Sequence, residues 1–241
     1  MSSSGCPALE EVQLEKCVFF TTRNPKIVSS SLKKLVADGE YRVYDDEIFR
    51  LIIDTPSLVS LRLGAEVLDH IVDTTEPHRL PSLVDASIHL YWIEDDVTQQ
   101  LGIFGVLSNV TTLHQLHFEV TCVFKFENLR TLFLDECRIR DDFLGVRQYL
   151  WNSHNLQKLT LRHCMVSDFQ PTKEVMERRQ SYSKDLVHFK CKNLMLSEII
   201  YRDGDDYVHL LVKCLVGMWR NLPNNKVELT VLKKKEHDQA H

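Results

Sequence analysis

Glycine, long apolar runs and an excess of positive charge are all scarce in this sequence, and each shortage excludes a class of protein. The chain has eight glycines among 241 residues, and none of them forms a glycine-rich phosphate loop. No stretch approaches the roughly 18 consecutive apolar residues of a membrane-spanning helix. The segment Met1 to Gly5 lacks the basic and apolar parts of a secretory signal. We therefore expect no nucleotide cofactor, no membrane contact and no export.

The charge and the cysteines narrow the class further. The formal net charge is −5, and the one basic run, Lys233 to Lys235, lies in a polar tail. Nucleic-acid binders usually gather Lys and Arg on one face, so no nucleic-acid partner is expected. Seven cysteines are an odd number in a chain without an export signal, which favours reduced thiols. The sequence thus predicts a cytoplasmic or nuclear protein.

Motifs for catalysis and metal binding are also missing. The sequence has no Gly-x-Ser-x-Gly elbow and no His-Glu-x-x-His helix, and no acid, base and nucleophile grouping emerges from its spacing. The one local cluster of metal-ligand residue types is His114-x-x-His117 near Cys122, which has no second ligand pair. We interpret these histidines as polar strand residues and expect no metal, no other cofactor and no enzymatic activity.

Internal repeats are the main signal. Three segments follow the pattern Leu-x-x-Leu-x-Leu-x-x-Cys with at most one conservative change, and they end at Cys17, Cys137 and Cys164. Weaker copies begin at Leu32, Leu58, Leu83 and Val110. The last copy is ambiguous, because Leu113-x-x-Leu116-x-Phe118 fits equally well. From Leu9 the first positions advance by 23, 26, 25, 27, 19 and 27 residues, mostly within the roughly 20–29 residues of leucine-rich repeats.

Simple geometry explains this pattern. The apolar residues of Leu-x-Leu are two apart, so both point to the same side of a short strand. The earlier Leu enters that core from the preceding turn, and the Cys lies where the chain bends away, buried against loop backbone groups. One unit cannot bury its apolar side alone, but stacked units can. The sequence predicts an α/β leucine-rich-repeat solenoid with a curved parallel sheet and structural cysteines.

The regular repeat fades after Cys164. We expect a polar loop with a short helix over residues 165–185, strand formers over residues 186–201, and the best helix of the chain from Tyr207 to Trp219. The alternation from Val227 to Val231 predicts a last strand, so that a helix and a strand cap the solenoid. The expected domains are leucine-rich repeats over 1–164, a C-terminal capping region over 165–232 and a polar tail over 233–241.

Several phrases recur at the starts of the repeats, namely Cys6 to Val12, Thr55 to Leu61, Leu80 to Ala86, Leu107 to Leu113, Asn128 to Leu132 and Trp151 to Leu156. Together with the stretch Tyr201 to Asp206, they resemble the plant F-box proteins that carry leucine-rich repeats and a C-terminal FBD-like region. The resemblance covers about residues 6 to 232. It departs at His154, where that family usually has Pro.

The resemblance implies substrate recognition within an SCF ubiquitin ligase, in which an F-box binds the cullin adaptor and the repeats hold a target. No F-box precedes the repeats, and the first repeat begins at Leu9 without a polar cap. We therefore expect an F-box-less or truncated relative, with adaptor binding only in a longer form. Two alternatives stay open: a small-molecule co-receptor of the F-box and leucine-rich-repeat type, and a non-functional fragment.

The outward strand residues are expected to line a concave face that binds a protein target. Its central row is expected to contain Gln13, Val36, Arg62, Ser87, His114, Phe133 and Thr160. The flanking rows are expected to hold Glu11, Lys34, Ser60, Asp85, Thr131 and Lys158 on one side, and Glu15, Asp38, His89, Asp135 and Arg162 on the other. Phe133 is the candidate aromatic anchor. The candidate partner-binding residues are Arg62, His89, Phe133, Asp135, Lys158 and Arg162.

Overall fold

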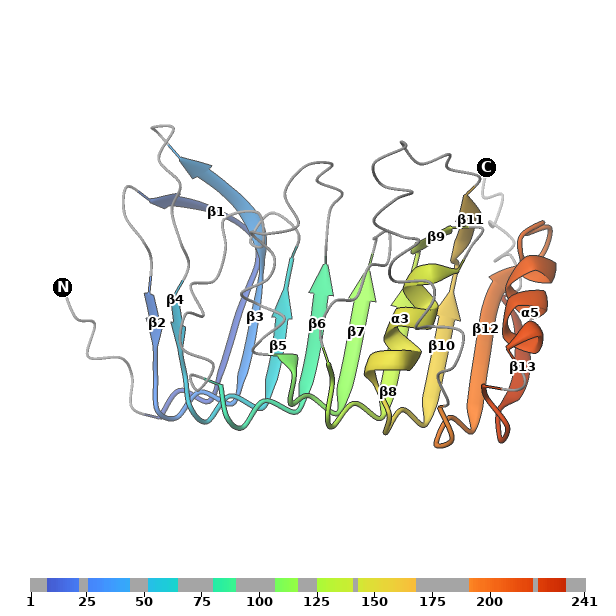
Figure 1. The fold of residues 1–241 in the computed structure, drawn as a ribbon. Helices are drawn as coiled ribbons and strands as arrows, with labels where there is room; N and C mark the ends of the chain where they lie inside the picture. The colour runs from blue at the N-terminus through green and yellow to red at the C-terminus, as the bar shows by residue number, and fades with distance from the viewer. Residues whose placement is uncertain are drawn as a thin grey trace, which may run out of the picture.

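One parallel sheet of nine strands runs through the computed structural model, which describes residues 8–21, 26–43, 52–64, 80–89, 107–116, 125–140, 143–167, 191–218 and 221–232. Every neighbouring pair of strands is parallel. Figure 1 shows the strands side by side. Their order is β1 (Glu11–Thr21), β3 (Lys34–Val43), β5 (Ser60–Leu63), β6 (Asp85–His89), β7 (Thr112–Leu116), β8 (Thr131–Asp135), β10 (Lys158–Arg162), β12 (Leu196–Arg202) and β13 (Lys226–Leu232). This arrangement confirms the expected solenoid built on a parallel sheet.

Alternate residues of each strand form the core. In β8, Leu132 and Leu134 are buried, whereas Thr131 and Phe133 are partly exposed. The register stacks equivalent residues of successive strands in rows, and burying each Leu side chain contributes about 1.5–3 kcal/mol. A slip by one residue would expose these rows, so the register is well specified. The buried rows are Leu35, Leu61, Ala86, Leu113, Leu132 and Leu159, then Ala37, Leu63, Ile88, Gln115, Leu134 and Leu161.

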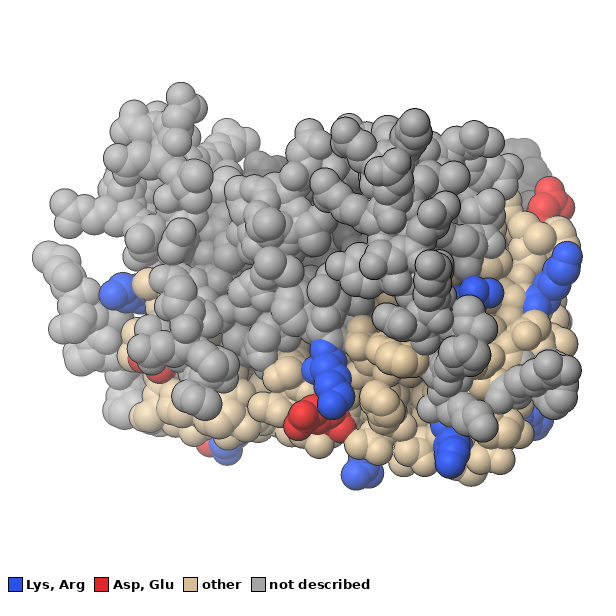
Figure 2. All heavy atoms as spheres, viewed as in Figure 1, with Lys and Arg blue, Asp and Glu red and all other residues tan. Residues whose placement is uncertain are grey.

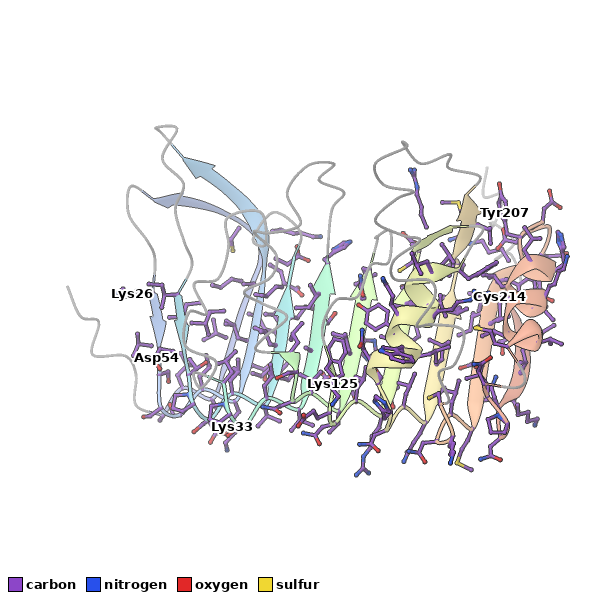
Figure 3. All side chains as sticks on the ribbon, viewed as in Figure 1. Lys26, Lys33, Asp54, Lys125, Tyr207 and Cys214 are labelled. Atoms are coloured by element: carbon purple, nitrogen blue, oxygen red, sulfur yellow. The ribbon has the colours of Figure 1, made fainter. Side chains whose placement is uncertain are left out.

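The turns before the strands form a ladder of their own. In one turn the amide of Leu58 donates to the carbonyl of Thr55 at 3.0 Å, which lets Leu58 enter the core. The carbonyl of Lys33, labelled at the lower edge of Figure 3, accepts from the amides of Val59 at 2.8 Å and Ser60 at 3.0 Å. The same double acceptor recurs at the carbonyls of Val59, Val84, Thr111, Arg130 and Gln157. Each turn is therefore bonded to the next.

The cysteines at the ends of the repeats donate hydrogen bonds to backbone carbonyls. The residue before each of them has a left-handed conformation, with φ of 53° at Lys16, 52° at Glu136 and 50° at His163. At Glu136 and His163 this conformation turns the chain just after β8 and β10, and at Lys16 it coincides with a register shift inside β1. Each thiol donates to the carbonyl two residues before it. The distances are 3.4 Å at Cys17, 3.4 Å at Cys137 and 3.6 Å at Cys164. The thiols therefore contact the backbone as expected, but their acceptors Glu15, Asp135 and Arg162 are strand residues and not loop residues.

Two helices are described, and both pack against the buried side of the sheet. In Figure 1, α3 (Leu144–Asn152) lies in front of β8 and β10, and α5 (Val208–Gly217) lies beside β12 and β13. Helix α3 buries Val146, Tyr149 and Leu150. The two helices therefore cover the core formed by the C-terminal strands.

Two short parallel ladders lie outside the main sheet. One pairs β2 (Lys26–Val28) with β4 (Ile52–Asp54), and the other pairs β9 (Arg138–Arg140) with β11 (Met165–Ser167). In Figure 1, β2 and β4 stand side by side to the left of the first strands of the sheet. The chain that returns between successive sheet strands is thus partly ordered by strand pairing.

The structure settles one open alternative and corrects two expectations. The repeat that begins at Val110 is the correct alternative, because Leu113 pairs with Ala86 and Leu132. Leu113 and Gln115 are therefore the two buried residues of this strand. Leu9, expected in the core, is 44% exposed.

The second correction concerns residues 165–167, which form β11 where a loop was expected. They become a strand because the left-handed His163 redirects the chain beside β9, where the amide of Met165 bonds to the carbonyl of Cys137 at 2.9 Å. Residues 168–190 and the tail 233–241 lie outside the described residues.

The predictions for the C-terminal region are confirmed for the last helix and the last strand. Helix α5 and strand β13 confirm the expected last helix and strand. A further copy of the repeat, Leu194-x-x-Ser197-x-Ile199, leads from the preceding turn into strand β12, and all three residues are buried. The sheet runs without interruption from β10 to β12, across the expected boundary after residue 164. The division into domains at that point stays a prediction.

Candidate partner-binding face

The side of the sheet opposite to its core is called here the open face. It carries the residues that alternate with the buried rows, and it corresponds to the expected concave face. The register aligns one row across this face: Gln13, Val36, Arg62, Ser87, His114, Phe133, Thr160, Glu198 and Glu228. The first seven are the expected central row, but two of them, Val36 and Thr160, were expected to be exposed and are buried, at 5% and 2% exposure. Sequence reasoning missed Glu198 and Glu228, because it did not extend the repeat beyond residue 164.

Phe133 lies between the ring of His114 and the guanidinium group of Arg162 on the open face. Its ring centroid is 5.1 Å from that of His114, its direct neighbour on β7, with a tilt of 35°. The guanidinium carbon of Arg162 lies 5.0 Å from the centroid of the Phe133 ring. A cation over an aromatic face at this range is attractive and restrains both side chains. Phe133 remains partly exposed, so it is available as an anchor.

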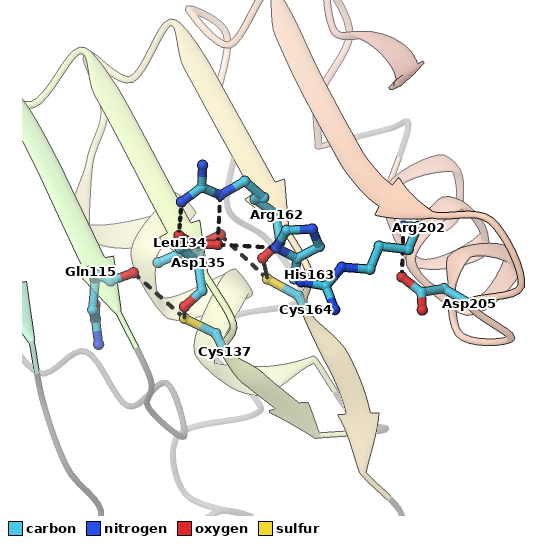
Figure 4. Close-up of polar contacts among 9 residues, drawn as sticks. All are labelled: Gln115, Leu134, Asp135, Cys137, Arg162, His163, Cys164, Arg202 and Asp205. Carbon is cyan, nitrogen blue, oxygen red and sulfur yellow. Dashed lines mark hydrogen bonds and ion pairs between the residues drawn. The ribbon is translucent and has the colours of Figure 1, made fainter. Parts of the chain in front are cut away.

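Asp135 holds Arg162 in this position. The Nε of Arg162 donates to Oδ1 of Asp135 at 2.8 Å, and Nη2 donates to Oδ2 (Figure 4). The Asp135 side chain is only 2% exposed, whereas that of Arg162 is 40% exposed. His163 also approaches this carboxylate, with Nδ1 3.8 Å from Oδ1. The hydrogen bond that Arg162 donates to Asp135 raises the pKa of Arg162 above its usual value.

Because it is buried, Asp135 supports the open face without being reachable from it. Expected at first among the outward contacts, Asp135 lies beneath Arg162, which covers it. Breaking such a pair by removing one partner leaves a charge without its counterpart, which is costly. Asp135 therefore positions Arg162, and a partner would meet Arg162 and Phe133.

Lys158, on β10, belongs to a second group of charged and polar side chains, which extends to β12 and β13. Its Nζ lies 3.1 Å from Oε2 of Glu198, which also accepts from Thr160 Oγ1 at 3.5 Å. The other oxygen of Glu198 accepts from Thr230 Oγ1 at 3.4 Å. Glu198 thus joins β10, β12 and β13 across the open face.

Arg62 lies far from this group, on β5. Its two terminal nitrogens lie 3.7 Å from Glu15 and 3.7 Å from Asp38. At the adjacent position Lys34 binds Glu11 at 2.6 Å, and this hydrogen bond, with a smaller one from Gln13, lowers the pKa of Glu11.

The six expected partner-binding residues therefore fall into two regions. Phe133, Asp135, Lys158 and Arg162 lie together on the adjacent strands β8 and β10. Arg62 lies on β5, and His89 is half-buried at the end of β6. The register that aligns Asp135 with Arg162 is a signal that sequence alone offers, since both follow the second core residue of neighbouring repeats.

The described residues hold no group of three or more His, Cys, Asp or Glu side chains suited to a metal ion. Of the expected metal candidates, His117 and Cys122 lie outside the described residues. Burial raises the pKa of the Cys164 thiol well above its usual range, and a hydrogen bond with Cys137 adds to the rise. Burial also raises the pKa of Cys191. These thiols remain protonated, as suits donors to backbone carbonyls.

Two further observations concern membrane-spanning helices and the distribution of basic residues. No described helix has the length and apolar character needed to cross a membrane. On the face seen in Figure 2, the described lysines and arginines lie apart from one another near the lower and right edges, with acidic residues beside some of them. That view shows no continuous basic patch among the described residues.

Comparison with known proteins gives one informative match. No protein-family model matches the chain, and no solved structure matches it. The chain is 26% identical over 254 residues to the MEIOTIC F-BOX protein MOF of Oryza sativa subsp. japonica. The match covers 91% of this chain and 50% of that protein, so the chain spans about half the length of this relative. This similarity points to an F-box-related family and is consistent with a role in protein interaction.

Proposed function

We propose that this chain is a leucine-rich-repeat recognition module that holds a protein target on its open face, as the substrate-binding part of an F-box-type ubiquitin-ligase subunit. The observation that carries the proposal is the group of Phe133, Arg162 and Asp135. An aromatic side chain is held partly exposed by a cation that is itself fixed on a buried carboxylate. Aromatic and Arg side chains of this kind dominate binding energy in protein interfaces.

Three further observations support the proposal. The repeat spacing and the Leu-x-Leu strands fit the leucine-rich type. Both described helices pack on the core side of the nine-stranded parallel sheet, away from the open face. The matched rice protein is named as an F-box protein. The proposal assigns no catalysis to the chain and places it in the cytoplasm or nucleus, where ubiquitin ligases of this kind meet their targets.

The first experiment compares proteins captured from cells by three tagged versions of the chain. These are the unchanged chain, Phe133→Ala on the open face, and Met195→Ala in a turn, where the side chain is 65% exposed. A true target is retained by Met195→Ala and lost by Phe133→Ala. With that target purified, Phe133→Ala is expected to weaken binding by about 1–3 kcal/mol in calorimetry. Equal affinity for Phe133→Ala, with the fold intact by circular dichroism, would contradict the proposal.

A second experiment addresses the ligase. An antibody against residues 208–217 captures the endogenous protein, whose intact mass and co-purifying proteins are then measured. A form heavier than 28.1 kDa that brings down the cullin adaptor supports a ligase subunit. A form of 28.1 kDa without the adaptor would instead indicate target binding outside the ligase.

A further inference from the structure

The open face has an uneven charge. Among the side chains described for β1, β3, β5 and β6, those in register on the open face include four carboxylates and two cations: Glu11, Glu15, Asp38 and Asp85 against Lys34 and Arg62. The strands β7 and β8 carry Thr112, His114, Leu116, Thr131 and Phe133 beside the buried Asp135. A negative region thus adjoins an uncharged region that contains Phe133.

The contacts show where the negative charge is uncompensated. Glu11 is closely paired with Lys34 at 2.6 Å. Arg62 is shared between Glu15 and Asp38 at 3.7 Å from each, so one cation serves two carboxylates. These two acidic side chains are 51% and 40% exposed, and a partner can reach them.

Asp85 is the second source of negative charge. The polar contact found for its carboxylate is the hydroxyl of Ser60, which donates to Oδ2 at 3.2 Å. A hydroxyl supplies a hydrogen bond but no positive charge. Asp85 lies on β6, between the Arg62 position and Phe133, so it continues the negative region toward the aromatic centre.

We propose that the target presents an extended segment that crosses the strands, with an apolar side chain on Phe133 and Lys or Arg side chains over Asp85 and over the Glu15–Asp38 pair. This inference rests on the proposed function and specifies the chemistry of its partner. Complementary charge of this kind selects partners and speeds their association.

The strand spacing fixes the expected sequence pattern. Neighbouring strands lie about 4.8 Å apart, and an extended segment advances about 3.3 Å per residue. Asp85 is two strands from Phe133 and two residues toward the start of the strands, at about 12 Å, which corresponds to roughly three to four residues. Asp38 is four strands away and two residues toward the end of the strands, at about 20 Å, which corresponds to roughly six residues. The partner is therefore a segment with basic residues about three to four and about six positions to one side of an apolar anchor.

The test uses a displayed library of random nine-residue peptides, sorted for binding to the full chain. Four versions serve as bait: the unchanged chain, Phe133→Ala, the double variant Glu15→Gln with Asp38→Asn, and Glu228→Gln. The last is the matched control, because Glu228 is an open-face carboxylate at the other end of the sheet that is paired with Lys226 at 2.7 Å. Selected peptides are then synthesised, and their Kd is measured at low and high salt.

The expected result is enrichment of Lys or Arg about six positions from an apolar residue. The double variant is expected to lose this enrichment and to weaken the synthetic peptide by roughly tenfold at low salt, with a smaller change at high salt. Glu228→Gln is expected to behave as the unchanged chain.

Two other results are distinguishable. Peptides that depend on Phe133 but show no basic enrichment, or an acidic one, overturn the inference and leave the proposed function standing. Peptides that are unaffected by Phe133→Ala, or a complete lack of binding peptides, overturn both.

Discussion

The hydroxyl of Tyr149 in α3 donates a hydrogen bond to Oε1 of Gln115 in β7, at a core position where neighbouring repeats carry Ile88 and Leu134. Gln115→Leu or Tyr149→Phe is expected to lower the free energy of unfolding by about 1–3 kcal/mol, since each leaves a buried polar group without this partner. The double variant is expected to lose clearly less free energy of unfolding than the two single variants together. Both polar groups are absent from it, so neither is left buried without the other.

Urea denaturation of the four proteins measures this coupling, with the exposed Tyr207→Phe as a control that is expected to change little. Strict additivity of the two single changes would show that the bond contributes nothing.

Lys16 has a left-handed backbone, with φ of 53°, where β1 shifts register between Glu15 and Cys17. Glycine adopts this conformation without a steric penalty, so Lys16→Gly is expected to stabilise the protein by about 0.5–1 kcal/mol. Lys34→Gly, within a regular strand, is expected to destabilise it. Thermal unfolding of both variants tests the pair, and a lower melting temperature for Lys16→Gly would refute the strain at this position.

Leu194 and Met195 are neighbours in the turn before β12 but differ completely in burial, at 0% and 65% exposure. Leu194→Ala is expected to cost about 2–5 kcal/mol, because it leaves a cavity in the core. Met195→Ala is expected to change the stability by less than about 0.5 kcal/mol. Denaturant unfolding compares the two, and similar losses would mean that this copy of the repeat does not enter the common core.

Burial raises the pKa of the Cys214 thiol in α5 from 9.0 to about 12. The folded state therefore keeps a proton that the unfolded state loses above pH 9, so this contribution to stability is complete below pH 9 and is lost as pH rises toward 12. At pH 10 the loss is expected to be about 1 kcal/mol relative to pH 8. Cys214→Ala should show a smaller fall over this range in denaturant titrations. An equal fall in both proteins would assign it to other groups.

The sequence was informative wherever a period of two controlled burial. The alternation of Leu132 and Leu134 with Phe133 was enough to predict the strand, its core side and its open side, because a strand has no other way to bury two residues that are two apart. The same logic placed the central row from Gln13 to Thr160. These predictions needed no knowledge of contacts beyond one repeat.

Other features depended on contacts between distant residues. Gln115 is tolerated in the core because Tyr149 reaches it from a helix 34 residues later, and no local pattern indicates that. The copy at Leu194 was overlooked because Ser197 stands where Leu is usual and a long segment separates it from Leu156. Asp135 is buried because Arg162, one repeat later, covers it, so its exposure was predictable only with the register in hand.

The bonded turns have a mechanical consequence. A load applied to the two ends of the sheet passes through each turn in series, since every doubly accepting carbonyl joins one repeat only to its neighbour. Stretching a single molecule between its ends should therefore release the chain in successive steps of unequal length, which follow the unequal spacing of the repeats. Phe133 and Arg162 lie on adjacent strands, so the contact between them would be lost in a single one of those steps.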